Sequence, residues 1–246
     1  MRGPLFPLWP APPGGRREGP ELLDDPRLAD SPLAENIADL RRVNRWLGGW
    51  STLRSELLHI LPGSLPGTRM TLLDVGGGSG DLALEALRTL SARGWDARAM
   101  VLDSHPAVVR IAAAHSGDGL RLGVLQGDAR RIPLADDSVD VAFCSALLHH
   151  FSDTEAGKVL REMGRVARLA VVAVDLRRGW LPYWGARITL RALGLSRVSL
   201  HDGPLSVARS FTPEEFRRLA RDAGLVRTVV RRHAGYRIAV RGVPMR

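Results

Sequence analysis

The chain has 246 residues, of which 45% are hydrophobic and 25% charged, so it is long enough to bury a sizeable core in one domain. A formal net charge of +9 raises the question of nucleic acid, but the arginines are scattered, Lys158 is the only lysine, and no dense basic block interleaved with aromatics occurs, which argues against that partner. No apolar run approaches the roughly 20 residues of a membrane span, and the single cysteine, Cys144, excludes an internal disulfide and a cysteine-based zinc cluster, so we expect a soluble cytoplasmic protein.

The N-terminal region divides into a leader and two helices. Prolines and glycines interrupt the few apolar side chains of residues 1–20, and we expect these residues to be a disordered leader or an over-long gene start. Residues 31–50 have helical spacing and end at Gly48-Gly49, and residues 53–61 end at Pro62-Gly63. Residues 21–68 are therefore predicted to form a helical cover over a pocket.

The middle of the chain alternates between short apolar runs and amphipathic segments. This alternation is typical of a parallel sheet with helices on both faces. Strands are predicted at residues 70–75, 97–102, 120–126, 139–145 and 170–175, and helices at residues 81–91, 106–115 and 155–166.

Beyond residue 175 the alternation stops. Residues 176–209 are predicted to be an insertion over the carboxyl edge of the sheet. The sequence Thr212-Pro213-Glu214-Glu215 predicts a helix start with Thr212 as N-cap and Glu215 completing a capping box. Residues 226–232 and 236–240 predict a hairpin around Ala234-Gly235. We expect residues 69–246 to form an α/β core, a doubly wound, mainly parallel seven-stranded sheet of Rossmann-like type, with the insertion as a helical lid.

The strongest chemical signal is a glycine turn between the first core strand and its helix. The run Leu72-Leu73-Asp74-Val75-Gly76-Gly77-Gly78-Ser79-Gly80-Asp81 follows this order. Glycines let the backbone pass close to a ligand at positive φ, and the following helix directs free N–H groups at that position. The strand before and the helix after make a ligand-binding turn a stronger interpretation than an ordinary tight turn.

Two further acids end the next two strands of the predicted sheet. Asp103, followed by Ser104, lies roughly twenty residues beyond the glycine turn, which is the spacing of an acid that accepts hydrogen bonds from ribose hydroxyls. Asp128, in Gln126-Gly127-Asp128-Ala129, is a candidate acceptor for an adenine edge. The alternatives are a helix N-cap for Asp103 and an ordinary loop aspartate for Asp128.

The charges around the turn discriminate between nucleotide ligands. Dinucleotide enzymes space their glycines as Gly-x-Gly-x-x-Gly, whereas here they fall at Gly76, Gly78 and Gly80. Asp74 and Asp81 would repel a pyrophosphate but attract the ammonium and sulfonium of S-adenosylmethionine. A sulfonium ligand is therefore favoured.

With these motifs the chain resembles the class I S-adenosylmethionine-dependent methyltransferases, particularly the ubiquinone/menaquinone-biosynthesis type, over roughly residues 69–175. The resemblance implies S-adenosylmethionine as cofactor and no metal. It implies that Asp103 and Ser104 hold the ribose, Asp128 and Ala129 the adenine, and that Ser145 and His150 border the methyl donor. The methionine part would be cradled by Asp74, Gly76, Gly77, Gly78, Gly80 and Asp81.

Two departures from that family are visible. The usual Pro-Gly-Gly turn before the fifth strand is replaced by Val166-Ala167-Arg168-Leu169. The fourth strand also lacks the Asn/Asp-Pro-Pro-Tyr ending of enzymes that methylate exocyclic nitrogens of bases, which argues against nucleic-acid amino groups as acceptors.

The residues that would meet the methyl acceptor are less specific. His149 and His150 follow the fourth strand, and each has a structural or solvent-facing role as its alternative. His201, in His201-Asp202-Gly203-Pro204, is a candidate catalytic base, with a simple turn as the alternative; the segment resembles relatives encoded beside plant-type polyketide synthases, which implies a phenolic or quinone-like acceptor.

Aromatic side chains of the insertion bear on the shape of that acceptor. Trp180, Tyr183 and Trp184 are candidates for the wall of an apolar acceptor site, or for plain core packing. Together with the histidines they predict transfer of a methyl group to an oxygen or carbon of a small aromatic metabolite.

Two other functions are compatible with the same motifs. One is a non-catalytic protein that binds S-adenosylmethionine as a regulatory or assembly module, because a fold does not settle activity. The other is an RNA methyltransferase, whose binding would depend steeply on salt.

Overall fold

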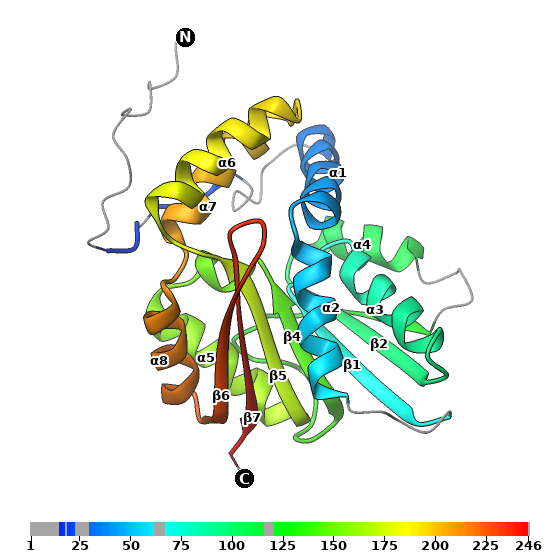
Figure 1. Ribbon diagram of the computed structural model, residues 1–246. Helices are drawn as coiled ribbons and strands as arrows, with labels where there is room; N and C mark the ends of the chain where they lie inside the picture. Colours follow the sequence, from blue (N-terminus) through cyan, green and yellow to red (C-terminus); the bar gives the residue numbers. More distant parts are fainter. Residues whose placement is uncertain (1–14, 18, 23–29, 62–66, 116–120, 246) are drawn as a thin grey trace.

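The computed structural model describes residues 15–17, 19–22, 30–61, 67–115 and 121–245. Within them, seven strands form one sheet in the order β3-β2-β1-β4-β5-β7-β6 (Figure 1). Strands β1 to β5 run parallel to one another, whereas β7 runs antiparallel to β5 and β6, which confirms the predicted mainly parallel, doubly wound sheet. The strands are β1 (Arg69–Val75), β2 (Asp96–Asp103), β3 (Leu122–Gln126), β4 (Val139–Ser145), β5 (Ala167–Leu176), β6 (Leu225–His233) and β7 (Arg237–Pro244).

Helices cover both faces of the sheet and the edge at which the parallel strands end (Figure 1). One face packs against α2 (Gly49–Ile60), α3 (Asp81–Ser91) and α4 (Pro106–Ala114), and the other against α5 (Asp153–Val166) and α8 (Pro213–Asp222). The carboxyl edge lies beneath α1 (Asp30–Trp46), α6 (Trp180–Ala192) and α7 (Arg197–Arg209). The predicted insertion is therefore a pair of helices, and the site it covers is the edge where β1, β2 and β4 end.

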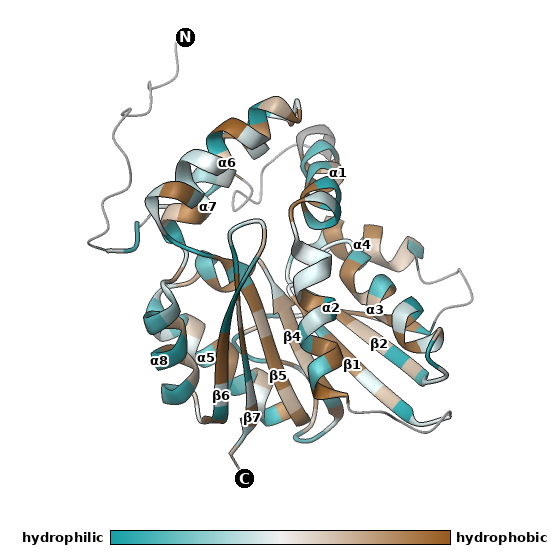
Figure 2. Cartoon of the chain, viewed as in Figure 1, coloured by the Kyte–Doolittle hydropathy of each residue, from teal (hydrophilic) through white to brown (hydrophobic). Residues whose placement is uncertain are grey.

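The hydropathy of the strands explains this layering. The central strands carry the most apolar residues (Figure 2), and β4 and β5 are buried along most of their length. Strands buried on both faces need near-continuous apolar runs. The outermost strand β6 instead alternates exposed and half-buried positions, with arginines on its open side that discourage pairing with another chain.

Capping boxes fix the start of two helices. Thr212 Oγ1 accepts the Glu215 N–H at 3.3 Å, and Glu215 Oε2 accepts the Thr212 N–H at 2.8 Å, as the sequence predicts. The same reciprocal pair joins Ser152 and Glu155, so α5 begins at Asp153, two residues before the predicted start. The hairpin at Ala234-Gly235 is also confirmed, because β6 and β7 pair antiparallel on either side of it.

Some predicted boundaries are wrong. Gly48 adopts a left-handed conformation with φ of 84°, which ends the first helix at Trp46 and starts the second at Gly49 instead of residue 53. Strand β5 begins at Ala167, directly after α5, because Ala167 already pairs with Val139 of β4.

The segment His201-Asp202-Gly203-Pro204 is not a turn. Ser196 caps α7 by accepting the Ser199 N–H at 3.3 Å, and the helix runs through Pro204 to Arg209. The turn alternative is therefore wrong. None of the helices in the described part of the chain is both long and apolar enough to cross a membrane.

Part of the predicted leader packs against the core. Residues 1–14 and 18 lie outside the described residues, but the Arg16 guanidinium stacks 3.9 Å from the centre of the Phe211 ring and donates to the Phe151 carbonyl at 2.8 Å. The Arg17 N–H donates to the Ala208 carbonyl of α7 at 3.1 Å. The expectation that the chain is disordered up to residue 20 is therefore wrong at Arg16 and Arg17.

Candidate active site

The glycine turn lies between the end of β1 and the first residue of α3. Gly76, Gly78 and Gly80 have φ of 65°, 57° and 80°, where other residues would be strained. A Cβ atom at Gly76 would lie 2.5 Å from Leu147, and one at Gly77 would lie 2.6 Å from the Asp74 carboxyl carbon. At Gly78 a Cβ atom would meet nothing within 4 Å. The turn is thus closed by its own neighbours at Gly76 and Gly77 and open at Gly78.

Asp74 is buried directly beneath this turn. Its side chain is almost completely buried, and its Oδ2 atom has no hydrogen-bond partner among the described residues. Burial raises the pKa of the Asp74 carboxyl well above its ordinary value, and the negative charges of Asp103 and Asp81 raise it further. A buried carboxylate oxygen without a partner costs free energy, so this position favours a cation.

Ser145 provides a second buried polar atom at the same edge. It is the last residue of β4, the strand that pairs with β1 on the side away from β2. Within the described part of the chain its Oγ atom has no hydrogen-bond partner and is shielded from solvent. Two neighbouring strands therefore each end in a side chain with one buried oxygen that no described residue hydrogen-bonds.

Asp103 is joined to the glycine turn by a hydrogen bond. Its Oδ2 accepts the Gly78 N–H at 3.0 Å, and its Oδ1 accepts the His105 N–H at 2.9 Å. A carboxylate oxygen has two lone pairs, so each oxygen keeps one for a further donor such as a ribose hydroxyl. The neighbouring Ser104 is exposed. The predicted proximity of Asp103 to the turn is present in the structure.

Asp81, the first residue of α3, accepts two hydrogen bonds from neighbouring side chains. Its Oδ2 accepts the Ser79 hydroxyl at 2.6 Å and the Arg41 Nε–H at 2.9 Å. Arg41 comes from α1, so the helix that covers the edge is linked to the glycine turn.

Asp128 lies beyond β3 with both carboxylate oxygens engaged by Arg130. Its Oδ1 accepts the Arg130 backbone N–H at 2.8 Å, and its Oδ2 accepts the Arg130 Nη2–H at 2.8 Å. The hydrogen bonds from the Arg130 side chain hold the pKa of Asp128 below its ordinary value. Asp128 is exposed, whereas the adjacent Ala129 is buried in the core. An adenine amino group would therefore share this carboxylate with Arg130, a partner that sequence reasoning missed.

His149 is buried and anchored by Asp175 at the end of β5. Its Nδ1 lies 2.6 Å from Asp175 Oδ1, and its backbone N–H donates to Asp175 Oδ2 at 3.1 Å. Burial alone would raise the pKa of Asp175, but the charge and hydrogen bond of His149 hold it below its ordinary value. Asp175 was missed as a site residue, although its place at the carboxyl end of a predicted strand was a usable signal.

Glu21 lies against both histidines. Its Oε1 is 3.6 Å from His149 Nε2, and its Oε2 is 3.8 Å from His150 Nε2. The Ser206 hydroxyl donates to Glu21 Oε1 at 2.9 Å, and Arg209 Nη1 lies 3.8 Å from the same atom. Burial raises the pKa of Glu21 to about 7. No pattern around Glu21 in the sequence indicated this position.

Two arginines hold the loop that carries the histidines. Arg209 donates to the carbonyl oxygens of His149 at 3.0 Å and His150 at 2.7 Å, and Arg16 donates to that of Phe151. These side chains come from α7 and from the segment before α1. The histidine loop, residues 146–151, is therefore held in place from α7 and from the segment before α1.

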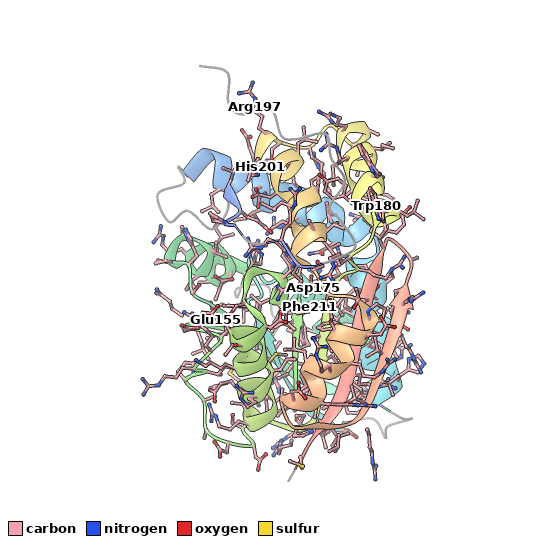
Figure 3. All side chains as sticks on the ribbon, turned by 90° about the vertical axis from the view of Figure 1, so that its left-hand side faces the viewer. Glu155, Asp175, Trp180, Arg197, His201 and Phe211 are labelled. Atoms are coloured by element: carbon pink, nitrogen blue, oxygen red, sulfur yellow. The ribbon has the colours of Figure 1, made fainter. Side chains whose placement is uncertain are left out.

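His201 belongs to α7 of the lid. It lies in the lid, above Asp175 (Figure 3), and its Nδ1 is 2.6 Å from Asp202 Oδ1. It lines a cavity of about 120 Å³ between α6, α7 and Arg17.

The aromatic side chains of α6 do not form one wall. Tyr183 is buried against Val207 and Ala208 of α7, whereas Trp180 and Trp184 are exposed. Trp180 lies on the outer part of the lid (Figure 3).

Residues 72–170 match the protein family described as "Methyltransferase domain". The chain is 33% identical to the ubiquinone/menaquinone biosynthesis C-methyltransferase of Vibrio vulnificus over 121 residues, which are 49% of this chain and 45% of the relative. The corresponding enzyme of Dinoroseobacter shibae is 36% identical over 109 residues, 41% of this chain and 42% of the relative. The chain thus spans less than half the length of these curated relatives.

Solved structures share the fold over most of the chain. A methyltransferase dependent on S-adenosylmethionine from Aquifex aeolicus has a TM-score of 0.62 at 23% identity and covers 89% of this chain and 97% of that one. Human N-acetylserotonin methyltransferase, solved with S-adenosylmethionine, has a TM-score of 0.61 at 17% identity, covering 85% and 55%. A family 2 O-methyltransferase from Planctomyces limnophilus, solved with apigenin, has a TM-score of 0.57 at 19% identity, covering 86% and 62%.

Proposed function

We propose that the chain transfers a methyl group from S-adenosylmethionine to a small aromatic acceptor. The match of residues 72–170 to the methyltransferase-domain family and the fold shared with solved methyltransferases support this proposal. The observation that carries the proposal is the Oδ2 atom of Asp74, which is buried beneath the glycine turn and has no hydrogen-bond partner in the described part of the chain. It stands where the resemblance puts the cationic methionine part of the cofactor.

The residues of the turn fit that cofactor. S-adenosylmethionine, when bound, supplies an electrophilic methyl group on a sulfonium and also carries an ammonium. Asp74 offers a carboxylate oxygen in a site with little solvent, where attraction to a cation is strong. Gly78 leaves open space for a ligand to approach the backbone, and Asp103 keeps acceptor capacity beside it. In our proposal the residues Gly76, Gly77, Gly80 and Asp81 complete the cradle, Asp103 and Ser104 hold the ribose, Asp128 and Ala129 hold the adenine, and Ser145 borders the methyl group.

The acceptor side of the proposal rests on the histidine loop at the end of β4. Methyl transfer is an in-line displacement in which an acceptor lone pair forms the new bond to carbon and the carbon–sulfur electron pair returns to sulfur. Positioning the acceptor and managing its proton are therefore the tasks left to the protein. His149 and His150 lie in the short helical turn that begins three residues after Ser145, so we assign them to the nucleophilic atom of the acceptor. His201 lines a cavity between α6 and α7, and we keep it as a further candidate base for the acceptor.

The acceptor class is supported by the relatives. Two are named for C-methylation in ubiquinone and menaquinone biosynthesis, and one neighbouring fold was solved with apigenin. We propose an oxygen, or a carbon, of a phenolic, quinone-like or polyketide metabolite as the methyl acceptor.

A labelled-methyl assay tests this function. Purified full-length chain is incubated with S-adenosylmethionine labelled at its methyl group and a panel of phenols, hydroxyquinones and RNA, and products are separated by extraction. We expect label in an organic-soluble aromatic product and none in RNA. Cofactor binding with no turnover on any acceptor would favour a regulatory module, and label in RNA would replace the small-molecule acceptor.

A further inference from the structure

Three side chains with metal-binding chemistry converge beneath α7. Glu21, His149 and His150 each offer one ligand atom, and these three atoms lie within 4.8 Å of one another. They come from the segment before α1 and from the turn after β4, far apart in the sequence. Glu21 and His149 are buried and His150 is half-buried.

Asp175 engages one ring nitrogen of His149, and the other, Nε2, is directed at Glu21. Asp175 is a hydrogen-bond acceptor, so the ring nitrogen Nδ1, 2.6 Å away, carries the proton and Nε2 is left with a lone pair in the neutral ring. That lone pair faces a carboxylate oxygen of Glu21 at 3.6 Å, a separation too long for a hydrogen bond. Two acceptors that face each other in a buried site need a cation between them.

The second contact has the same spacing. His150 Nε2 lies 3.8 Å from Glu21 Oε2, and the two imidazole rings are 4.3 Å apart between centroids. Ligands about 2.0–2.2 Å from one small ion lie roughly 3–3.6 Å from each other, so closing these gaps around an ion requires only small movements.

Hydrogen bonds with neighbouring residues orient His149 and Glu21 as they would orient metal ligands. Metal-binding histidines characteristically donate their second ring nitrogen to a carboxylate, as His149 does to Asp175, and ligating carboxylates are themselves hydrogen-bonded, as Glu21 is by Ser206. Arg209, 3.8 Å from Glu21, opposes a cation, but the carboxylates of Glu21 and Asp175 together outweigh its charge.

We propose that Glu21, His149 and His150 bind one divalent first-row transition-metal ion, such as Zn²⁺, through one carboxylate oxygen and two Nε2 atoms. Two histidines and one glutamate are a donor set of catalytic zinc sites and of open iron sites, whereas Mg²⁺ prefers oxygen ligands. Three protein ligands leave a coordination position open. The proposed role of that position rests on the proposed function: it takes an oxygen of the methyl acceptor and holds it beside Ser145.

The experiment titrates metal-stripped, full-length chain with Co²⁺ alone and follows the visible absorption of the bound ion. Zn²⁺ affinity is then measured by competition with a chelating dye. We expect one equivalent to bind, with the spectrum of a site of low coordination number that contains nitrogen ligands. Glu21→Gln and His150→Asn should each weaken Zn²⁺ binding at least about tenfold, and Asp175→Asn about 10- to 100-fold by releasing the orientation of His149.

The matched control is His233→Asn, which removes another histidine held by a buried glutamate. His233 Nε2 lies 2.9 Å from Glu56 Oε1 of α2, at the last residue of β6. Neither residue contacts Glu21, His149 or His150 in the described interactions, so this variant should keep the wild-type Co²⁺ spectrum and Zn²⁺ affinity. Because His150 is half-buried, His150→Asn should fold, which circular dichroism checks even if the Glu21 variant is unstable.

The absence of a saturable equivalent of Co²⁺, or affinities unchanged in both Glu21→Gln and His150→Asn, would overturn the site and leave a proton as the cation between His149 and Glu21. The outcome does not depend on the cofactor. Metal binding without affinity for S-adenosylmethionine would sink the proposed function alone, and cofactor binding without metal would sink this inference alone.

Discussion

The two halves of the site are built in opposite ways. The cofactor half comes from one short stretch, the glycine turn with Asp74, and from Asp103 on the adjacent strand β2. The acceptor half gathers Glu21, His149, Asp175 and Arg209 from four separate segments. A local motif keeps its geometry through backbone constraints, whereas a dispersed cluster depends on the cover staying closed. Variants in the two halves should therefore fail in different ways.

The largest effect is expected from Asp74→Asn. A buried carboxylate whose Oδ2 atom has no hydrogen-bond partner among the described residues contributes about 3 kcal/mol when a cation binds to it, so the variant should lose roughly 100-fold in affinity for S-adenosylmethionine. Isothermal titration calorimetry measures this loss. The matched control is Asp140→Asn, at the start of β4 on the opposite edge of the sheet, which should bind like the wild type. Equal affinity in both variants would remove Asp74 from the cofactor half.

Asp103→Ala should have the next largest effect on the cofactor half. If the carboxylate accepts ribose hydroxyls, its loss weakens binding by about 1–3 kcal/mol. The same substitution also removes the acceptor for the Gly78 N–H, so Asp103→Asn, which keeps one oxygen, separates the two roles. Calorimetry with both variants is the check, and unchanged affinity in the alanine variant contradicts the assignment.

In the acceptor half, Glu21→Gln should spare the cofactor and damage turnover. We expect affinity for S-adenosylmethionine within about twofold of the wild type, because Glu21 contacts the histidines and α7, not the glycine turn. Turnover on the acceptor should fall about tenfold or more, because losing one ligand or its supporting group commonly costs a metal site that much activity. Parallel calorimetry and labelled-methyl assays test this, and a joint loss of both would show that the halves are not separable.

The pH dependence of stability sharpens the role of Asp74. Its pKa is raised in the folded protein, so the folded state binds more protons than the unfolded state above pH about 4. The contribution of Asp74 to the free energy of unfolding therefore falls as pH rises from there. The Asp74→Asn side chain does not ionise, so this variant does not lose stability in this way as pH rises. Its thermal midpoint should therefore exceed that of the wild type by a margin that grows with pH. Denaturation scans across pH, with Asp140→Asn as control, measure the margin; a margin that shrinks with pH would contradict the assignment.

The smallest effect is expected at the adenine end. Asp128 is exposed and shared with Arg130, and an exposed pair of this kind contributes at most about 1 kcal/mol. Asp128→Ala should weaken S-adenosylmethionine binding by no more than about fivefold, and Arg130→Ala by about twofold or less. A loss in Asp128→Ala as large as that in Asp74→Asn would show that adenine recognition, and not the buried carboxylate, dominates the cofactor half.

The contrast also explains what could be predicted from the sequence. The sheet follows from apolar runs and glycine stops, and α3 and β4 match their predicted bounds because both have clear boundary signals. The break at Gly48-Gly49 was predicted from its glycines, but the second helix starts at Gly49 and not at residue 53, because Gly48 already forms its N-cap. Pro204 favoured a turn at residues 201–204, but α7, which Ser196 caps at its start, continues through Pro204.

The site residues also differ in how far the sequence could predict them. The proximity of Asp103 to the glycine turn was predictable, since parallel strands end at one edge. Glu21 was not, because only the folded cover brings it beneath α7, to Ser206 and the histidines. Arg16 was likewise assigned to a disordered leader, and its contacts with Phe211 and the histidine loop depend on residues more than a hundred positions away.

In our proposal the buried carboxylate of Asp74 makes the glycine turn a site for a cationic nucleoside. The direct measurement is calorimetric titration of the full-length chain with S-adenosylmethionine, and with adenosine as an uncharged competitor, against wild type and Asp74→Asn. We expect one saturable site for S-adenosylmethionine in the wild type, and a preference for S-adenosylmethionine over adenosine that is lost in Asp74→Asn. No saturable binding by the wild type, or a preference that survives in the variant, would contradict it.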